Sequence, residues 1–155
     1  MSTTNSETWL ALKRNVRFGD TDAAGVMHFY QLLRWCHEAW EESLDLYGIP
    51  AKCLFPNSNE LDSEVSIALP IVHCKANFFS PLYTGDHLEI ELVPKKITAG
   101  LFQIETKFKR EKKDVAIGLI RHCAINTKSR ERCALPEEID LWLESSSLRL
   151  GVTPL

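Results

Sequence analysis

The sequence predicts an α+β fold in which one antiparallel sheet wraps around one long helix. Apolar residues recur at three- and four-residue steps from His28 to Gly48, which is the period of a helix. Apolar and polar residues then alternate strictly in 87–93 and 101–109, which is typical of antiparallel strands with one face in water. A single amphipathic helix needs a broad apolar surface, and such a sheet supplies it. With no linker or repeat, we expect residues 1–155 to form a single domain.

The first two elements are a strand and the long helix. WLALKRNVRF at 9–18 alternates imperfectly and predicts the strand. The apolar side of the helix is predicted to consist of Leu32, Leu33, Cys36, Trp40, Leu44 and Tyr47. Its polar side is predicted to consist of Gln31, Arg34, Glu38, Glu41, Glu42 and Asp45. Gly48 followed by Pro50 is a suitable end for a helix of about five turns.

The rest of the chain predicts the sheet. We expect a loop at 51–63, strands at 71–80, 87–93, 101–109 and 115–127, and a short helix at 136–145. The 115–127 segment is apolar on both sides, so it is predicted to be a central strand. KFKREKK at 107–113 is typical of a hairpin with a lysine-rich tip. Pro136 fits the first turn of the last helix.

The composition excludes several classes of protein. A net charge of −3 and a pI near 6.0 argue against a protein that coats nucleic acid. Five cysteines without a CxxC pair, and histidines without HxH or HxxxH spacing, predict no metal site. Cys36, Cys74 and Cys123 lie in apolar segments and are expected to be buried. Without a secretory signal or an apolar run of membrane-spanning length, we expect a soluble protein in the reducing cytoplasm.

GDTDAAGVMHF at 19–29 is the best candidate for a functional site. Asp22 precedes the long helix, whose first N–H groups have no internal partners and suit an oxyanion. An ionised Asp there could act as a nucleophile or as a general base, while Gly25 would let a substrate approach the backbone. The alternative is structural, because Asp is a common helix cap and Gly a common turn residue. Asp20 could lie beside Asp22 if the strand continued that far.

VRFGDTDAAGVMHFYQLLRWCHEAWEE, together with VHCKANFFSPLYTGDHLEIEL, resembles the hotdog-fold acyl-CoA thioesterases of the 4-hydroxybenzoyl-CoA thioesterase family. The pattern is a strand, D-x-D-x-x-G-[VI], and then the long helix. Within the family, DTDAAGVMHF and QLL-x-x-CHEAWE look most like the 1,4-dihydroxy-2-naphthoyl-CoA hydrolases of phylloquinone synthesis. The resemblance covers nearly the whole chain.

The resemblance implies a hotdog fold and a specific site. The catalytic carboxylate would be Asp22, the amide that polarises the thioester carbonyl would be that of Phe29, and His28 would lie beside it. Asp20 would then support the loop. Domains of this family pair through their sheets and commonly form tetramers, with active sites between subunits. Coenzyme A would enter as part of the substrate, and no other cofactor is implied.

Two departures from the family pattern stand out. Where the 4-hydroxybenzoyl-CoA enzymes have a basic cluster for the CoA phosphates, this chain has PKKITAG, so Lys95 and Lys96 become the candidates. A solvated strand end explains them equally well. His28 also replaces an aromatic residue, which argues against 4-hydroxybenzoyl specificity.

We therefore expect hydrolysis of an aromatic acyl-CoA, foremost 1,4-dihydroxy-2-naphthoyl-CoA. The alternatives are the same reaction on another acyl group, such as 4-hydroxybenzoyl, phenylacetyl or fatty acyl, and a non-catalytic acyl-CoA binding domain. In the last case Asp22 would serve only as a helix cap.

Overall fold

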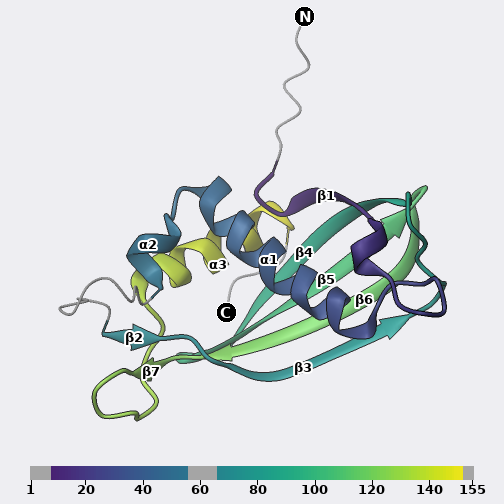
Figure 1. The fold of residues 1–155 in the computed structure, drawn as a ribbon. Helices are drawn as coiled ribbons and strands as arrows, with labels where there is room; N and C mark the ends of the chain where they lie inside the picture. Colours follow the sequence, from purple (N-terminus) through teal and green to yellow (C-terminus); the bar gives the residue numbers. More distant parts are fainter. Residues whose placement is uncertain (1–7, 56–65, 152–155) are drawn as a thin grey trace, which may run out of the picture.

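The computed structural model describes residues 8–55 and 66–151. Figure 1 shows a long helix lying across a curved sheet. The elements, in chain order, are β1 (Ala11–Asn15), the 3₁₀-helix η1 (Phe18–Asp20), α1 (Phe29–Tyr47), α2 (Ala51–Leu54), β2 (Ile67–Ala68), β3 (Ile71–Phe78), β4 (His87–Thr98), β5 (Leu101–Arg110), β6 (Lys113–Cys123), β7 (Ile125–Asn126) and α3 (Glu137–Arg149).

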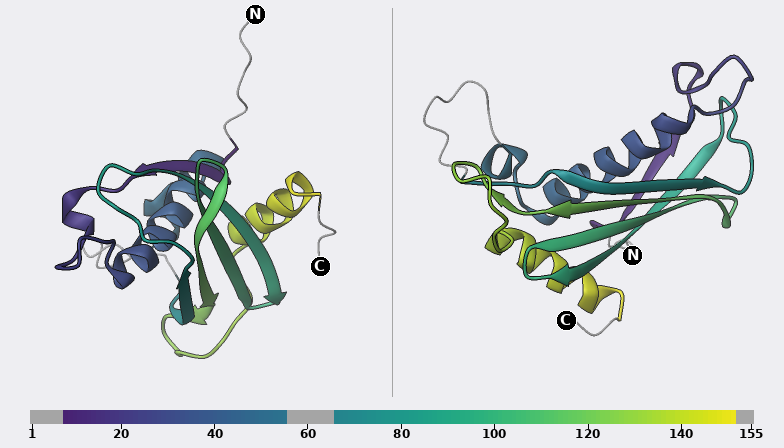
Figure 2. Two further views of the ribbon diagram at one scale, coloured as in Figure 1. Left: turned by 90° about the vertical axis from the view of Figure 1, so that its right-hand side faces the viewer. Right: turned by 90° about the horizontal axis from the view of Figure 1, so that it is seen from below.

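The main sheet is antiparallel throughout, with strand order β1-β4-β5-β6-β3. It bends around α1, which contacts β3, β4 and β6 (Figure 2). The α+β expectation is therefore confirmed, as is the interior position of the 115–127 strand. A second, two-stranded sheet pairs β2 with β7. The sequence predicted one strand over 115–127, but its last residues leave the main sheet to form β7.

The inner face of the sheet carries the predicted alternation. Leu88, Ile90 and Leu92 are each 1% exposed on β4, and Phe102, Ile104 and Phe108 are at most 2% exposed on β5. The lysine-rich tip between β5 and β6 is confirmed as a tight hairpin. Glu111 and Lys112 both have positive φ there, as a two-residue hairpin turn requires.

Helix α1 begins and ends close to where the sequence predicts. Gly48 follows it with φ 112°, a left-handed conformation that glycine adopts without strain. The buried arc is wider than predicted, because Gln31, assigned to the polar side, is 9% exposed. Trp35 and Ser43, which the prediction placed on neither side, are buried as well, and the Trp142 ring N–H of α3 donates to the Ser43 hydroxyl.

Other local differences concern the ends of elements. The first strand spans only Ala11–Asn15, since η1 interrupts the extended chain before Asp20. The predicted 51–63 loop contains the short helix α2, and its residues from 56 onward lie outside the described part. The last helix continues to Arg149.

The two edges of the main sheet differ in what packs beside them. On one side β1 pairs with β4 over 87–91, and α3 packs against β4 as well. On the other side β3 is an edge strand, and most of its side chains are exposed. The expectation that Cys74 is buried is therefore wrong, whereas Cys36 and Cys123 are buried as predicted.

Candidate active site

The 20–28 loop is a small closed structure rather than an extension of β1. Thr21 and Met27 form an isolated antiparallel bridge, and the Asp22 N–H donates to Val26 O at 2.9 Å. Gly25 closes the loop with φ 78°, a conformation that other residues adopt only with strain. The N–H of His28 donates to Asp20 O at 2.9 Å, so the loop also ties its own ends together.

The Asp22 carboxylate is oriented by its own loop. One oxygen accepts the Ala24 N–H at 2.8 Å. The second oxygen accepts no hydrogen bond from any described residue. The residue that caps α1 is His28, six positions later, so Asp22 is not the helix cap. This arrangement fixes the carboxylate through one oxygen and leaves the other for a reactant.

The start of α1 lies beside this carboxylate. Within the described residues, the Phe29 N–H has no acceptor, as expected for the first amide of a helix. The helix dipole adds a partial positive charge at the same place. The Phe29 ring is 57% exposed, and its centroid lies 6.2 Å from that of Phe78 on β3.

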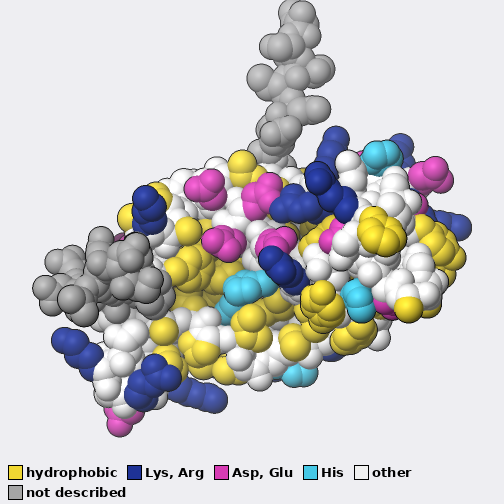
Figure 3. Space-filling view, in the orientation of Figure 1, with side chains coloured by type: hydrophobic (Ala, Val, Ile, Leu, Met, Phe, Trp, Pro, Cys, Tyr) yellow, Lys and Arg dark blue, Asp and Glu magenta, His cyan; other side chains and the backbone are white. Residues whose placement is uncertain are grey.

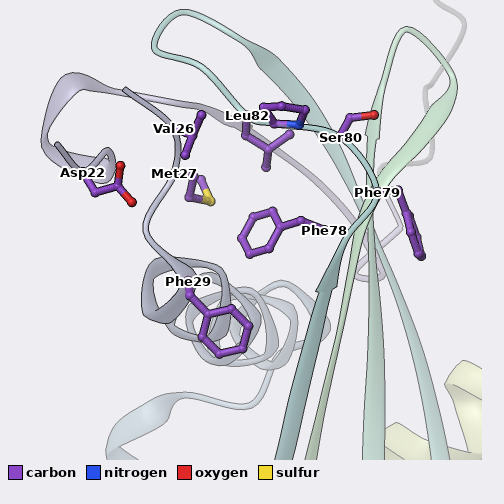
Figure 4. Close-up of a pocket in the computed structure, with 9 residues that line it drawn as sticks. Asp22, Val26, Met27, Phe29, Phe78, Phe79, Ser80 and Leu82 are labelled. Carbon is purple, nitrogen blue, oxygen red and sulfur yellow. The ribbon is translucent and has the colours of Figure 1, made fainter. Parts of the chain in front are cut away.

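Asp22 and Phe29 line one cavity of ≈ 460 Å³. Figure 4 shows the Asp22 carboxylate pointing toward the apolar side chains of this cavity. The loop and helix side consists of Asp22, Val26, Met27 and Phe29, and the opposite side consists of Phe78, Phe79, Ser80, Pro81 and Leu82. A mostly apolar cleft of this size with one carboxylate and one unpaired amide suits a small acyl group whose carbonyl carbon is attacked.

The other candidate residues are placed differently. His28 and Gly25 are adjacent in sequence to residues that line the cavity, but neither of them lines it. The His28 ring lies 5.1 Å from that of Tyr30, and its amide is already engaged. The contribution of Gly25 is its positive φ, since a Cβ there would meet no heavy atom within 4 Å.

Lys95 and Lys96 are not brought to this cavity within one subunit. They lie about 26 Å (Lys95) and about 30 Å (Lys96) along β4 from His87, the end of the strand near the Asp22 loop. The Lys96 ammonium lies 2.7 Å from the Asp140 carboxylate of α3. Their role in binding CoA phosphates stays a prediction.

Sequence reasoning missed the far wall of the cavity. Residues 81–86 lie between the strands predicted at 71–80 and 87–93 and were given no role, although Pro81 and Leu82 line the cavity and Leu82 O accepts the Met27 N–H. No local pattern could have identified them, because their proximity to Asp22 follows from the way the β3–β4 connection crosses over the loop. Nor does any group of three or more His, Cys, Asp or Glu side chains in the described ranges have the arrangement of a metal site.

The family model of the thioesterase-like superfamily matches residues 16–143, so the chain belongs to this superfamily. It is 57% identical over 144 residues to a 1,4-dihydroxy-2-naphthoyl-CoA hydrolase of Synechococcus sp. (strain CC9311), covering 93% of this chain and 95% of the relative.

Solved structures agree with this assignment. A crystal structure from Prochlorococcus marinus MIT 9313 is 55% identical, with a TM-score of 0.86 and coverage of 92% and 99% of the two chains. A 1,4-dihydroxy-2-naphthoyl-CoA thioesterase from Synechocystis is 28% identical, with a TM-score of 0.75 and coverage of 86% and 94%. In the part of the chain that the structure describes, no helix is both long and apolar enough to cross a membrane.

Proposed function

We propose that this protein hydrolyses the thioester of an aromatic acyl-CoA, and that its preferred substrate is 1,4-dihydroxy-2-naphthoyl-CoA. The observation that carries the proposal is the shared cavity: it is lined by Asp22 and by Phe29, whose N–H has no acceptor among the described residues. The acyl group is that of the relatives named above, which match the chain over more than nine-tenths of its length in the Synechococcus case. The rings of Phe29 and Phe78 offer stacking surfaces to an aromatic acyl group.

In the proposed reaction the thioester carbonyl oxygen accepts the Phe29 N–H, which stabilises the negative charge that develops on it. The oxygen of Asp22 that is not bonded to Ala24 either attacks the carbonyl carbon or removes a proton from an attacking water. The C–S bond then breaks and coenzyme A leaves as a thiolate. On the first route, water subsequently cleaves the acyl-aspartyl anhydride. Both routes yield the free carboxylate and CoA, and neither needs a further cofactor.

The test is thiol release from 1,4-dihydroxy-2-naphthoyl-CoA, with benzoyl-CoA, 4-hydroxybenzoyl-CoA and palmitoyl-CoA as comparisons and protein dialysed against EDTA. We expect a preference of about a hundredfold for the naphthoyl thioester, equivalent to about 2.7 kcal/mol in transition-state binding. Asp22→Asn should lower kcat by about a thousandfold or more while substrate binding persists.

Three results would change the proposal. Preference for another thioester would change the substrate but keep the reaction. An active Asp22→Asn variant would remove Asp22 as the catalytic residue. No thiol release from any of the four would leave a binding domain instead of an enzyme.

We also propose that the active protein is a homo-oligomer in which the β3 edges of two copies pair. The β3 edge has no strand partner within the described chain, and Ile71 and Val72 on it are 42% and 48% exposed. Figure 3 shows hydrophobic side chains exposed over the region of α1 and β3. An unpaired edge with apolar side chains is a ready surface for pairing with another strand. Tetramers, built from two such dimers, belong to the same proposal.

A further inference from the structure

The cavity wall opposite Asp22 is an irregular segment that needs external support. Residues 79–86 connect β3 to β4 without regular structure. At its start, the N–H groups of Phe79 and Ser80 both donate to Val115 O on β6. At its end, the Val16 N–H donates to Asp86 O at 2.9 Å, and the Gly85 N–H donates to Val16 O at 2.7 Å. The middle, which includes the cavity-lining Pro81 and Leu82, lies between these two anchors.

Arg110, the last residue of β5, links the two halves of this segment. Its guanidinium donates to Pro81 O at 3.0 Å and to an Asp86 carboxylate oxygen at 2.6 Å. The same carboxylate oxygen accepts the Tyr83 N–H at 2.9 Å. The side chains of Arg110 and Asp86 are 29% and 21% exposed, and that Asp86 value is lower than that of any other acid in the ion pairs of the described residues. Because the pair is partly buried and makes several hydrogen bonds, it holds the backbone of the turn in one position.

The turn is in direct contact with the catalytic loop. Leu82, which is fully buried, accepts the Met27 N–H through its carbonyl oxygen at 2.8 Å. Met27 in turn pairs with Thr21 across the loop that carries Asp22, and it precedes Phe29 by only two residues. A shift of the Leu82 carbonyl would therefore move both the carboxylate loop and the start of α1.

From these contacts we infer that Asp86 and Arg110 form a positioning pair for the active site. This inference rests on the proposed thioesterase function. The pair touches no reacting atom; it holds Pro81 and the turn so that the Leu82 carbonyl keeps the Met27 amide in place. Because a carboxylate and an oxyanion donor must both meet one carbonyl group, a displacement of about 1 Å can cost up to a hundredfold in rate.

The kinetic test compares Arg110→Gln with Lys109→Gln. Lys109 is the neighbouring residue on β5 and forms a comparable ion pair with Glu91, 3.1 Å away, that does not contact the cavity wall. We expect Arg110→Gln to lower kcat by about ten- to a hundredfold with KM changed much less, and Lys109→Gln to leave both within about twofold. Asp86→Asn should lower kcat similarly, and the double variant should be no slower than the worse single one, since the two residues act as a unit.

Arg110→Lys provides the rescue. It keeps the charge and a donor nitrogen but not the shape and reach of the guanidinium, so it should recover part of kcat. If the wild type is active, equal effects of the variants at positions 109 and 110 would overturn the inference. Wild-type activity of Arg110→Gln would overturn it as well.

Amide hydrogen exchange decides the question without any assay of activity. In Arg110→Gln, the amides of Met27 and Tyr83 should exchange about tenfold faster than in the wild type, because the turn opens more often. The amide of Gly48, at the far end of α1, should be unchanged and serves as the internal reference. Unchanged exchange at Met27 would refute the positioning role even if the wild-type protein hydrolysed no thioester, so the two proposals fail separately.

Discussion

Asp20 and Asp22 are only two residues apart, yet the chain uses them for different purposes. Asp20 accepts the Arg17 N–H through its carboxylate and the His28 N–H through its carbonyl, so it joins the two ends of the loop. Asp22 accepts a single hydrogen bond, from Ala24, and faces the cavity. Of the two acids of D-x-D, only Asp22 lines the cavity with Phe29, so Asp22 is the position at which the proposed reaction is tested.

At the same scale, His122 should make stability depend on pH. Its Nδ1 lies 2.9 Å from Leu69 O and must carry the proton, while its Nε2 has no partner among the described residues. Burial, with a smaller effect of nearby His37, lowers the pKa of His122 to about 4, although the hydrogen bond to Leu69 opposes this. Below pH 6.5 the unfolded chain binds a proton that the folded protein does not, so the contribution of His122 is fully present above pH 6.5 and is lost toward pH 4.

The measurement is urea unfolding of the wild type and of His122→Gln at pH 7.5 and pH 4.5. Between these values the wild type should lose about 2–3 kcal/mol more of its unfolding free energy than the variant, which has no imidazole to titrate. Equal losses would mean that His122 titrates normally in the folded state.

At the scale of elements, the contact between α1 and β6 leaves no space for an added methyl group. A Cβ at Gly118 would lie less than 3 Å from the sulfur of Cys36, which is buried on α1. Burial also raises the pKa of the Cys36 thiol to about 12, so Cys36 is a packing residue rather than a reactive thiol. The helix and the strand approach each other closely because a glycine and a small side chain meet there.

Gly118→Ala should therefore lower the unfolding free energy by about 1–3 kcal/mol, the usual cost of an overpacked core. Cys36→Ala removes the sulfur that the new methyl group would strike, so the double variant should recover most of that loss. Thermal or urea unfolding of the four proteins measures the coupling. Additive losses would show that the two positions do not contact each other.

The same scale shows what a sequence can and cannot predict. Period and alternation belong to single elements, so they identify α1, β4 and β5 and the side chains that these elements bury. The residues of a strand do not reveal whether it lies at the edge or in the middle of the sheet, so Cys74 on the β3 edge was wrongly expected to be buried. Gln31 was misplaced for a related reason, since no periodicity within α1 reveals which neighbours cover its flank.

For the site, the sequence predicts one half. The D-x-D-x-x-G loop and the helix after it lie together along the chain, and both line the cavity. The other wall comes from residues 78–82, and its support comes from Arg110, more than eighty residues after Asp22. Such proximity depends on the completed fold, which explains why local patterns gave no sign of it.

At the scale of the whole molecule, the proposed pairing through β3 has a direct test. A single 17.6-kDa chain should be absent at micromolar concentration, and light scattering should give a multiple of that mass. Val72→Lys places a charge on the free edge and should release monomers, as lysines do on natural edge strands. Leu148→Lys, on an exposed apolar residue of α3, is the matched control and should keep the wild-type mass. A monomeric wild type, or an unchanged mass for Val72→Lys, would contradict the pairing.

The unequal edges of the sheet also determine how far such pairing can go. Each copy offers β3 as its long free edge, whereas the opposite edge is β1, a strand of only five residues, and α3 contacts the neighbouring strand β4. Two β3 edges that meet about a twofold axis use up that surface on both copies. The joined sheet then ends in β1 on both sides, and a very short edge strand is a poor template for a further strand, so growth beyond two subunits is disfavoured. The shortness of β1 thus works against polymerisation, a property that has no bearing on the reaction itself.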